Sequence, residues 1–289
     1  MKFLIRQILT IIIITSLHPG AHCHQEPPKT IHEKVEQEKE RLNYKNSGIK
    51  TVIIWDSIDK NKGTEKKHMM SKSMYDTNGN VISVSSYSES GAEQNSIRYS
   101  WDESNLMTEQ ITTDLRKGRE RTIFIYDSNG LIKKIFDLDS NGLQTDWFNY
   151  EYNTEKNIIT LTKFSRDSAI IYTIRYTYQD GSSFKYLTEA EQWDSNGTRA
   201  IKIIYKIENG RRSERQLFLS DGTLDHILKY TYLPDGQFKE ILKIKPDGST
   251  TSRRVFEYNK GNHLIKETEF DASGNNIRIL EYEYKYFKK

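Results

Sequence analysis

Residues 256–274 read Phe-Glu-Tyr-Asn-Lys-Gly-Asn-His-Leu-Ile-Lys-Glu-Thr-Glu-Phe-Asp-Ala-Ser-Gly, and this stretch carries a pattern that runs through most of the chain. An aromatic residue is followed by Asp or Asn and, shortly afterwards, by Gly. The same phrase occurs at 75–79, 126–130, 193–197 and 232–236. A fixed internal period is typical of a repeat array, in which neighbouring units bury each other's apolar faces.

The glycines of these phrases set the period. In the C-terminal half they lie about twelve to fourteen residues apart, so that every second one is about 25 residues on. Asp can bond the backbone two residues later, Asn tolerates the left-handed region, and Gly adopts a positive φ without steric cost. Asp-x-Asn-Gly therefore predicts a type I turn closed by a glycine bulge, which joins antiparallel strands. The glycines assigned to such turns are Gly79, Gly130, Gly142, Gly197, Gly222, Gly236, Gly248, Gly261 and Gly274.

The segments between the turns have the length and alternation of strands. About eight or nine residues remain for each strand, which leaves no room for helical crossovers. In 224–232 the two leucines and the two tyrosines share one side with His226, whereas Asp225, Ile227, Lys229 and Thr231 lie on the other. We expect on the order of 16 to 20 strands. The predicted fold class is all-β, with tandem antiparallel β-hairpins forming a long curved or coiled sheet.

The N-terminus has the composition of a secretory signal peptide. Lys2 and Arg6 precede an apolar run of about ten residues, which is short for a membrane span of roughly twenty, and Pro19-Gly20 then breaks the helix. We assign residues 1–23 to the signal peptide, with cleavage after Cys23. Two alternatives stay open: an N-terminal membrane anchor that is never cleaved, and lipidation of Cys23, which would tether the protein through lipid chains.

Residues 24–48 form a separate segment that is dense in Glu and Lys and poor in apolar residues. This composition predicts a charged linker or a solvated helix. The folded domain is then expected at 49–289, and its first strand at 51–55. Because Cys23 is the only cysteine, no internal disulfide is possible in the mature chain.

The charge balance excludes one class of partner. The chain carries 43 Lys and Arg against 40 Asp and Glu, a formal net charge of +3. Removal of Lys2 and Arg6 with the signal peptide leaves 41 against 40, or +1. Such a balance provides no electrostatic footprint for nucleic acid, and no transmembrane span is expected in the mature chain.

The sequence contains no recognisable catalytic constellation. It lacks the nucleophile elbow, the phosphate-binding loop, the dinucleotide-binding glycine pattern and the His-Glu-x-x-His zinc pattern. The seven histidines include no pair in the expected domain at a metal-ligand spacing. We therefore expect no enzyme activity, no catalytic residue and no cofactor. A glycan-cleaving enzyme with paired carboxylates is the remaining enzymatic alternative.

One segment has the alternation of a calcium loop. Asp137, Asp139 and Asn141 precede Gly142, and oxygen ligands at alternate positions surround Ca²⁺ in such loops. Phe148 stands at the twelfth position, where a bidentate Glu is expected. Because the repeat produces Asp-x-Asn-Gly turns for conformational reasons, these three residues are a calcium candidate only, and no metal site is assigned.

The 18 Tyr and 4 Trp residues can serve either packing or binding. Sugar rings present apolar faces to aromatic planes, so a glycan is one ligand that such residues could hold. The alternative is that they fill the inner face of the sheet and form cross-strand pairs, which we expect for most of them. Trp147 and Trp193 are the two candidates for an outward position.

The phrases Tyr-Asp-x-Asn-Gly and Tyr-x-Tyr-x-x-x-Gly-Asn-x-Leu-Ile-Lys-Glu resemble the YD repeats of the RHS family and, more loosely, MORN-like repeat proteins. The resemblance covers most of residues 70–289. It implies a secreted or surface protein whose repeats coil into a β-strand shell, which in the RHS family surrounds a toxic C-terminal domain. The matching positions are Tyr75, Asp76, Gly79, Tyr126, Asp127, Gly130, Tyr258, Gly261, Phe270, Asp271 and Gly274.

We predict an exported, non-enzymatic repeat protein that offers an extended binding or structural surface at the cell envelope. Its location is the cell surface, the secreted fraction or the periplasm, and its partner is a protein or a glycan. One alternative is an accessory of an RHS-like toxin system, either a shell fragment or a neutralising protein. Another is an outer-membrane β-barrel, which the short turns at both ends and the charged strand faces disfavour.

Overall fold

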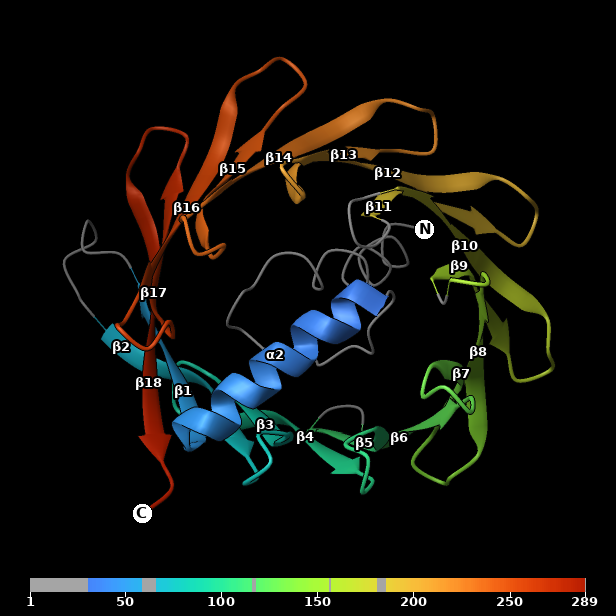
Figure 1. The fold of residues 1–289 in the computed structure, drawn as a ribbon, viewed down its shortest axis with the longest axis horizontal. Helices are drawn as coiled ribbons and strands as arrows, with labels where there is room; N and C mark the ends of the chain where they lie inside the picture. The colour runs from blue at the N-terminus through green and yellow to red at the C-terminus, as the bar shows by residue number, and fades with distance from the viewer. Residues whose placement is uncertain (1–30, 59–65, 116–117, 156, 181–185, 289) are drawn as a thin grey trace.

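The described part of the chain forms a closed antiparallel β-barrel with helix α2 across an opening (Figure 1). The computed structural model describes residues 31–58, 66–115, 118–155, 157–180 and 186–288. The signal peptide assigned to 1–23, the lipidation candidate Cys23 and the first part of the 24–48 segment lie outside these residues. Helix α2 (Ile31–Ser47) is followed by strands β1 (Ile49–Ile58), β2 (Lys66–Tyr75), β3 (Val81–Tyr87), β4 (Glu93–Trp101), β5 (Met107–Asp114), β6 (Gly118–Tyr126), β7 (Ile132–Leu138), β8 (Gln144–Tyr152), β9 (Ile158–Ser165), β10 (Ile170–Gln179), β11 (Tyr186–Asp194), β12 (Arg199–Glu208), β13 (Arg211–Phe218), β14 (Leu224–Tyr232), β15 (Phe238–Ile244), β16 (Thr250–Tyr258), β17 (Leu264–Asp271) and β18 (Asn276–Tyr286).

Closure comes from a pairing between the first and last strands. Each strand pairs antiparallel with its neighbours in sequence, and β1 also pairs with β18, where Val52 lies opposite Tyr284 and Ile54 opposite Tyr282. The 18 strands therefore form one ring without a free edge. Since an unpaired strand exposes N–H and C=O groups that can pair with another chain, closure removes a hazard that an open sheet would carry.

The predicted fold class is confirmed as all-β and antiparallel, but the prediction of a long curved or coiled sheet is wrong. The first and last strands of the sheet, β1 and β18, pair with each other and close it into a barrel. The resemblance to the YD repeats of the RHS family is corrected for the same reason, because these hairpins form a closed barrel rather than an open repeat coil. The spacing of the turns indicates only where each strand ends. Whether the first and last strands meet depends on the twist of the sheet and on the offset between neighbouring strands.

Most hairpin turns share one geometry, which the turn after β2 illustrates. The Gly79 N–H donates to the Asp76 carbonyl at 3.1 Å, and the Asp76 N–H donates to the Asn80 carbonyl at 2.9 Å. The Asp76 carboxylate also accepts the Asn80 N–H, at 2.8 Å. In the turn after β16 the positive φ belongs to Asn262, at 61°, and not to Gly261. The turn glycines with a positive φ are Gly79, Gly130, Gly142, Gly197, Gly222, Gly236, Gly248 and Gly274.

A second repeated contact ties the two strands of a hairpin together at one end of the barrel. An aromatic side chain near the end of the second strand donates to a backbone carbonyl near the start of the first, 19 or 20 residues earlier. Tyr258 Oη, for example, donates to the Phe238 carbonyl at 3.0 Å. The aromatic residue of the repeat is thus held by a hydrogen bond as well as by packing. The other pairs are Trp101–Val81, Tyr126–Met107, Tyr152–Ile132, Tyr232–Arg212 and Tyr284–Leu264.

Tyr258→Phe is expected to lower the free energy of unfolding by about 1 kcal/mol. The substitution keeps the ring in the core but leaves the Phe238 carbonyl without its phenol donor. Denaturant unfolding measures the change. Tyr286→Phe is the matched control, because Tyr286 is 51% exposed and should tolerate loss of its hydroxyl. Equal stability of the Tyr258→Phe variant and the parent chain would show that the bond contributes nothing.

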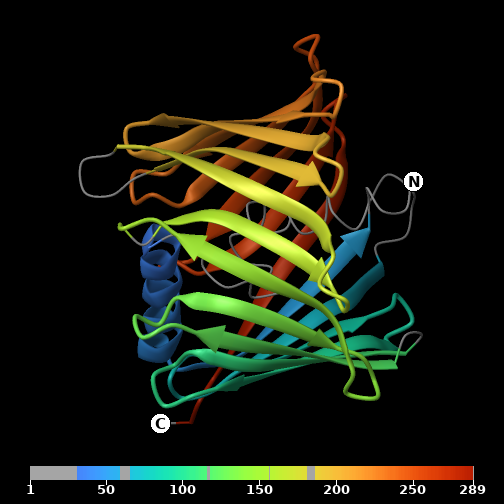
Figure 2. The ribbon, with the colours of Figure 1, turned by 90° about the vertical axis from the view of Figure 1, so that its right-hand side faces the viewer.

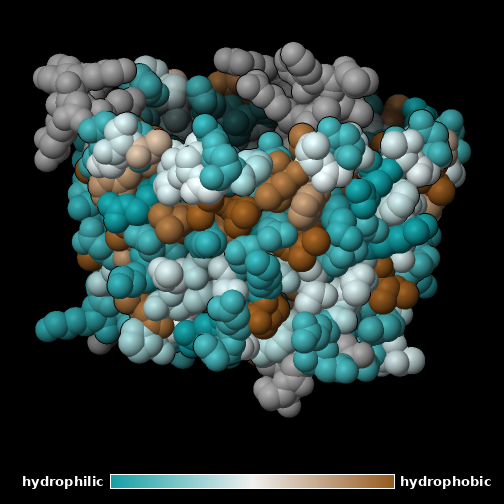
Figure 3. Space-filling view, turned by 90° about the horizontal axis from the view of Figure 1, so that it is seen from above, coloured by the Kyte–Doolittle hydropathy of each residue, from teal (hydrophilic) through white to brown (hydrophobic). Residues whose placement is uncertain are grey.

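The strands alternate between an inner face, toward the barrel axis, and an outer face. Inner-face residues such as Leu228, Tyr230 and Tyr282 belong to one apolar cluster with Tyr44 of α2. The outer face carries ion pairs among apolar residues, and Figure 3 shows the apolar residues of one side interrupted by hydrophilic ones. The outer-face pairs include Arg121–Glu109, Lys202–Glu189, Lys206–Glu214, Arg253–Glu240, Lys266–Glu257 and Lys67–Glu281.

Candidate functional site

Helix α2 lies across one end of the barrel, which we call the α2 mouth. The views in Figures 1 and 2 agree: the helix projects inside the ring of strands in the first and sits at one end of the barrel in the second. The turns at 76–80, 127–131 and 259–263 belong to this mouth. Among the residues that the structure describes, no helix has the length and apolar character needed to cross a bilayer.

Tyr44 anchors the C-terminal end of α2 in the wall. Its side chain is 8% exposed and its ring lies 4.7 Å from the ring of Tyr75, while His263 stacks at 6.3 Å. Ser47 Oγ is 3.1 Å from His263 Nε2. Burial lowers the pKa of His263, which favours the neutral imidazole in this contact. The helix is therefore attached to the barrel by an aromatic anchor close to the start of β1.

The middle of α2 rests directly on the turn after β2. A Cβ built on Gly79 would lie 2.2 Å from the Arg41 carbonyl oxygen and 2.9 Å from the Lys45 nitrogen, so only glycine allows the two backbones to approach this closely. The Arg41 guanidinium also donates to the Asn78 carbonyl. Farther along, Lys34 Nζ donates to the Gly130 carbonyl at 3.1 Å. Helix α2 therefore contacts two turns of the α2 mouth, at 76–80 and at 127–131.

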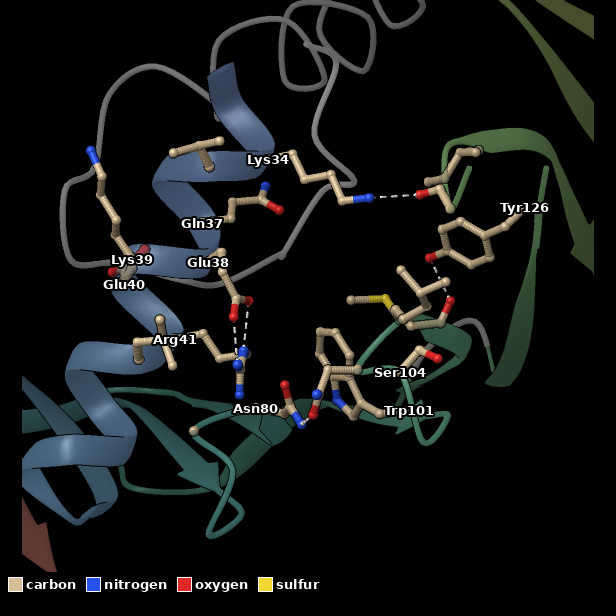
Figure 4. Close-up of a pocket in the computed structure, with 18 of the residues that line it drawn as sticks. Lys34, Gln37, Glu38, Lys39, Glu40, Arg41, Asn80, Trp101, Ser104 and Tyr126 are labelled. Atoms are coloured by element: carbon tan, nitrogen blue, oxygen red, sulfur yellow. Dashed lines mark hydrogen bonds and ion pairs between the residues drawn. The ribbon is translucent and has the colours of Figure 1, made fainter. Parts of the chain in front are cut away.

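Between α2 and the inner wall lies a cavity of about 850 Å³. Figure 4 shows Lys34 and Glu38 of the helix on one side of this cavity and Trp101 and Tyr126 of the wall on the other. Pockets that hold small molecules have volumes of about 300 to 1,000 Å³. The cavity is therefore large enough for a small ligand.

Apolar side chains line both sides of the cavity. On α2, Val35 and Leu42 line it and are 47% and 38% exposed. The wall contributes Leu106, Met107 and Trp101 to the same lining. Helices normally bury their apolar residues against a core, so these two exposed side chains leave an apolar surface that a ligand in the cavity can cover.

The polar groups of the cavity are mostly engaged with protein. Asn80 Nδ2 donates to Asn105 Oδ1 at 2.9 Å, and Arg41 pairs with Glu38 at 2.6 Å. The hydrogen bond from Arg41 lowers the pKa of Glu38, so both groups stay charged and offset one another. Burial raises the pKa of Tyr126, which keeps this phenol neutral. The lining consequently offers an apolar slot with a polar border and little unbalanced charge.

The residues proposed as a calcium site are divided between a strand and a turn. Asp139 and Asn141 share the turn after β7, where Asp139 Oδ1 accepts the N–H groups of Asn141 and Leu143 at 2.9 Å each. Asp137 lies on β7; its carboxylate accepts the Thr122 hydroxyl at 2.8 Å, and burial raises its pKa. In the described part of the chain, no group of three or more His, Cys, Asp or Glu could hold a metal ion.

Trp147 and Trp193, the two tryptophans considered for glycan binding, lie on the outer face of the barrel. The rings of Phe136 and Phe164 flank Trp147, with centroids 6.4 and 4.0 Å away. The Arg175 guanidinium lies 5.4 Å from the Trp193 ring. Since protein groups flank the Trp147 ring, this residue belongs to a cross-strand aromatic row and is not a platform for a sugar.

The contribution of α2 to the site was not part of the sequence prediction. Residues 24–48 were expected to form a charged linker or a solvated helix, whereas the structure packs Tyr44 into the barrel. The available signal was Tyr44 itself, the one Tyr, Trp or Phe among the Glu- and Lys-rich residues 31–47. Val35 and Leu42 carry no comparable signal, because isolated apolar residues are common on solvated helices.

Comparison with known proteins does not assign a family. No family model matches the sequence, and no curated protein matches it. A porin-like protein from Bacteroides uniformis is similar in structure at 10% identity and a TM-score of 0.46, over 82% of this chain and 98% of that one. A porin-like protein from Bacteroides vulgatus follows at 10% identity and 0.37, over 83% and 99%. An outer membrane lipoprotein-sorting protein domain from Vibrio parahaemolyticus has 9% identity and 0.21, over 88% and 93%.

Proposed function

We propose that this chain is an exported, non-enzymatic protein of the cell envelope that binds an amphipathic ligand between α2 and the inner wall of its barrel. Export is supported by residues 1–23, where two positive charges, a short apolar run and a helix-breaking Pro-Gly pair follow one another as in a secretory signal peptide. A role in binding rather than in catalysis is supported by the cavity lining, where Arg41 is paired with Glu38 and the phenol of Tyr126 is neutral.

The outer face of the barrel supports a position in water. Ion pairs such as Arg121–Glu109 and Lys202–Glu189 occupy outer-face positions on separate parts of the wall. A Lys or Arg on the lipid-facing side of a membrane barrel costs about 2 to 4 kcal/mol at the bilayer midplane. A wall with several such groups is better stabilised by water, so the barrel is proposed to carry its ligand inside and present a hydrated surface outside.

The observation that supports the ligand class is the apolar part of the cavity lining, to which both α2 and the wall contribute. Val35 and Leu42 on α2 remain exposed, and they line the same cavity of about 850 Å³ as Trp101 and Met107. Covering apolar surface contributes about 25 cal/mol for each Å² removed from water. An alkyl chain can lie along these apolar side chains, and its polar head can meet the charged groups of α2 at the border. A medium-chain fatty acid has this shape and chemistry.

The test is displacement of a fluorescent amphiphile. Anilinonaphthalene sulfonate is expected to brighten on binding to the purified chain, and laurate is expected to displace it. Leu42→Asp places a charge in the cavity and should weaken both ligands about tenfold or more. Leu143→Asp is the matched control, because Leu143 is 48% exposed in the turn after β7, at the end of the barrel opposite α2.

Circular dichroism of each variant first establishes that the barrel is folded. Binding of laurate that is equal in the parent and Leu42→Asp chains would contradict the proposed cavity. Absence of any competition between laurate and the dye would contradict the ligand class. Loss of binding in Leu143→Asp as well would show that the dye fluorescence depends on apolar surface exposed anywhere on the protein rather than on binding at this site.

A further inference from the structure

Lys34 is a cation in the cavity beside α2, which we call the α2 cavity, and it has no carboxylate partner there. Its ammonium donates to the Gly130 carbonyl at 3.1 Å, and among the described side chains it makes no ion pair. An ammonium carries three donors, so two of them remain for a ligand. Figure 4 shows the Lys34 side chain extending from α2 across the cavity toward the turn after β6. The end of this side chain therefore offers positive charge inside the cavity.

The other charged groups of the lining are engaged with protein. Arg41 pairs with Glu38 at 2.6 Å, and it contributes more than Lys34 does to the lowered pKa of this carboxyl group. Asp127 Oδ1 accepts two backbone N–H groups of its own turn at 2.9 Å each. The remaining two each have a protein interaction of their own. The charged residues of the lining other than Lys34 are Glu38, Lys39, Glu40, Arg41 and Asp127.

The ammonium of Lys34 lies beside an apolar part of the wall. A Cβ built on Gly130 would be 3.3 Å from Lys34 Nζ and 3.6 Å from Leu106 Cδ1, so the charge and the methyl group border the same point. Leu106 precedes Met107, which lies opposite Trp101 in the pairing of β4 with β5. These three wall residues all line the cavity. An apolar path thus begins at the charge and continues along the wall to Trp101.

We propose that Lys34 binds the carboxylate of the amphipathic ligand, and that the alkyl chain extends from there along the wall toward Trp101. This inference rests on the proposed function and adds the head group and the orientation of the ligand. Ammonium groups bind carboxylates through charge-assisted hydrogen bonds, which are roughly twice as strong as neutral ones. A neutral head group would leave the ammonium without an anion. The cavity is therefore expected to select a fatty acid over the alcohol of the same chain length.

Quenching of tryptophan fluorescence by bromine tests the orientation. Of the four Trp residues, all of them in the described part of the chain, only Trp101 lines the cavity. The ω-bromo derivative of laurate carries its bromine at the end of the tail, and the α-bromo derivative carries it beside the carboxylate. The ω-bromo acid should quench more strongly, and Trp101→Phe should remove most of this quenching. Stronger quenching by the α-bromo acid would overturn the proposed orientation.

The same titration measures the role of Lys34 in affinity. The parent chain should bind ω-bromolaurate about tenfold more tightly than ω-bromododecanol, which has the same chain and a neutral head. Lys34→Gln is expected to abolish this preference by weakening the binding of the acid alone. Lys45→Gln is the matched control, because Lys45 is an exposed residue of α2 that is not among the residues lining the cavity. It removes the same charge and should keep the preference.

The outcomes distinguish this inference from the proposed function. A preference for the acid that survives in Lys34→Gln, or that is lost equally in Lys45→Gln, would overturn the role of Lys34 and leave the cavity as a ligand site. Equal weakening of the acid and the alcohol in Lys34→Gln would overturn it as well, because Lys34 would then only hold α2 in place. If neither probe binds the parent chain, the proposed function and this inference both fail.

Discussion

Gly79→Ala is expected to detach α2 from the mouth of the barrel. The new methyl group would lie 2.2 Å from the Arg41 carbonyl oxygen, and neither of the two backbones can turn away from it as a flexible side chain could. Overpacking of this kind costs about 1 to 3 kcal/mol, in addition to the strain of a non-glycine residue at a φ of 83°. Limited trypsin digestion should then cleave α2 rapidly after Arg41, a site that the docked helix protects.

Gly274→Ala provides a closely matched control for this effect. Gly274 has the same φ of 83°, in the turn between β17 and β18, but no atom lies within 4 Å of a Cβ built on it. Both variants lose the left-handed freedom of glycine, and only Gly79→Ala meets the helix. Equal melting temperatures and equal rates of cleavage in α2 for the two variants would mean that the contact between Gly79 and α2 does not hold the helix.

The second large effect is alkaline unfolding between about pH 10 and pH 12. Burial raises the pKa of Tyr232 from 10.0 to about 12. The pKa is also raised by burial at Tyr44, Tyr75, Tyr126, Tyr152, Tyr230, Tyr258 and Tyr284. A raised pKa in the folded state gives stability that is complete below the unfolded value and disappears as the pH rises through the folded value. Several phenols therefore ionise together as the barrel opens.

The ultraviolet absorbance of phenolate and the far-ultraviolet circular dichroism, recorded in one titration, measure this event. Both signals should change together and steeply. Tyr258→Phe removes one of the shifted phenols, so the transition should release about one proton fewer. A phenolate signal that rises gradually around pH 10 while the strand signal persists would show that these hydroxyl groups are open to solvent in the folded barrel.

The hairpins could be predicted from the sequence because their determinants are local. Asp76 and Gly79 lie within one turn, and the alternation of His226, Leu228 and Tyr230 belongs to one strand. Each of these features is decided by sterics and hydrogen bonds over a few residues. Short segments of the sequence are therefore enough to predict the antiparallel strands and the face of each strand that packs inward.

Closure of the barrel and the α2 cavity could not be predicted in the same way. The seam between β1 and β18 depends on the accumulated twist and offset of all the hairpins between them. The docking of α2 depends on Gly79, but the turn requires a glycine at this position in any case, because its φ is positive. The sequence therefore gives no sign that a helix covers it. Val35 becomes informative only when the structure shows that it lines a cavity together with residues of the barrel wall.

The seam between β1 and β18 also determines when the barrel can be completed. Trp55 Nε1 donates to the Glu283 carboxylate across it at 3.0 Å, although the two residues are 228 positions apart in the chain. During synthesis, β1 is made before all the other strands and its partner β18 after them, so one edge of β1 stays unpaired until the last hairpin is available. Pairings between distant residues form slowly, and open edges invite aggregation while they wait. A chaperone that shields β1 would therefore protect the chain during the whole interval between the synthesis of its first and its last strand.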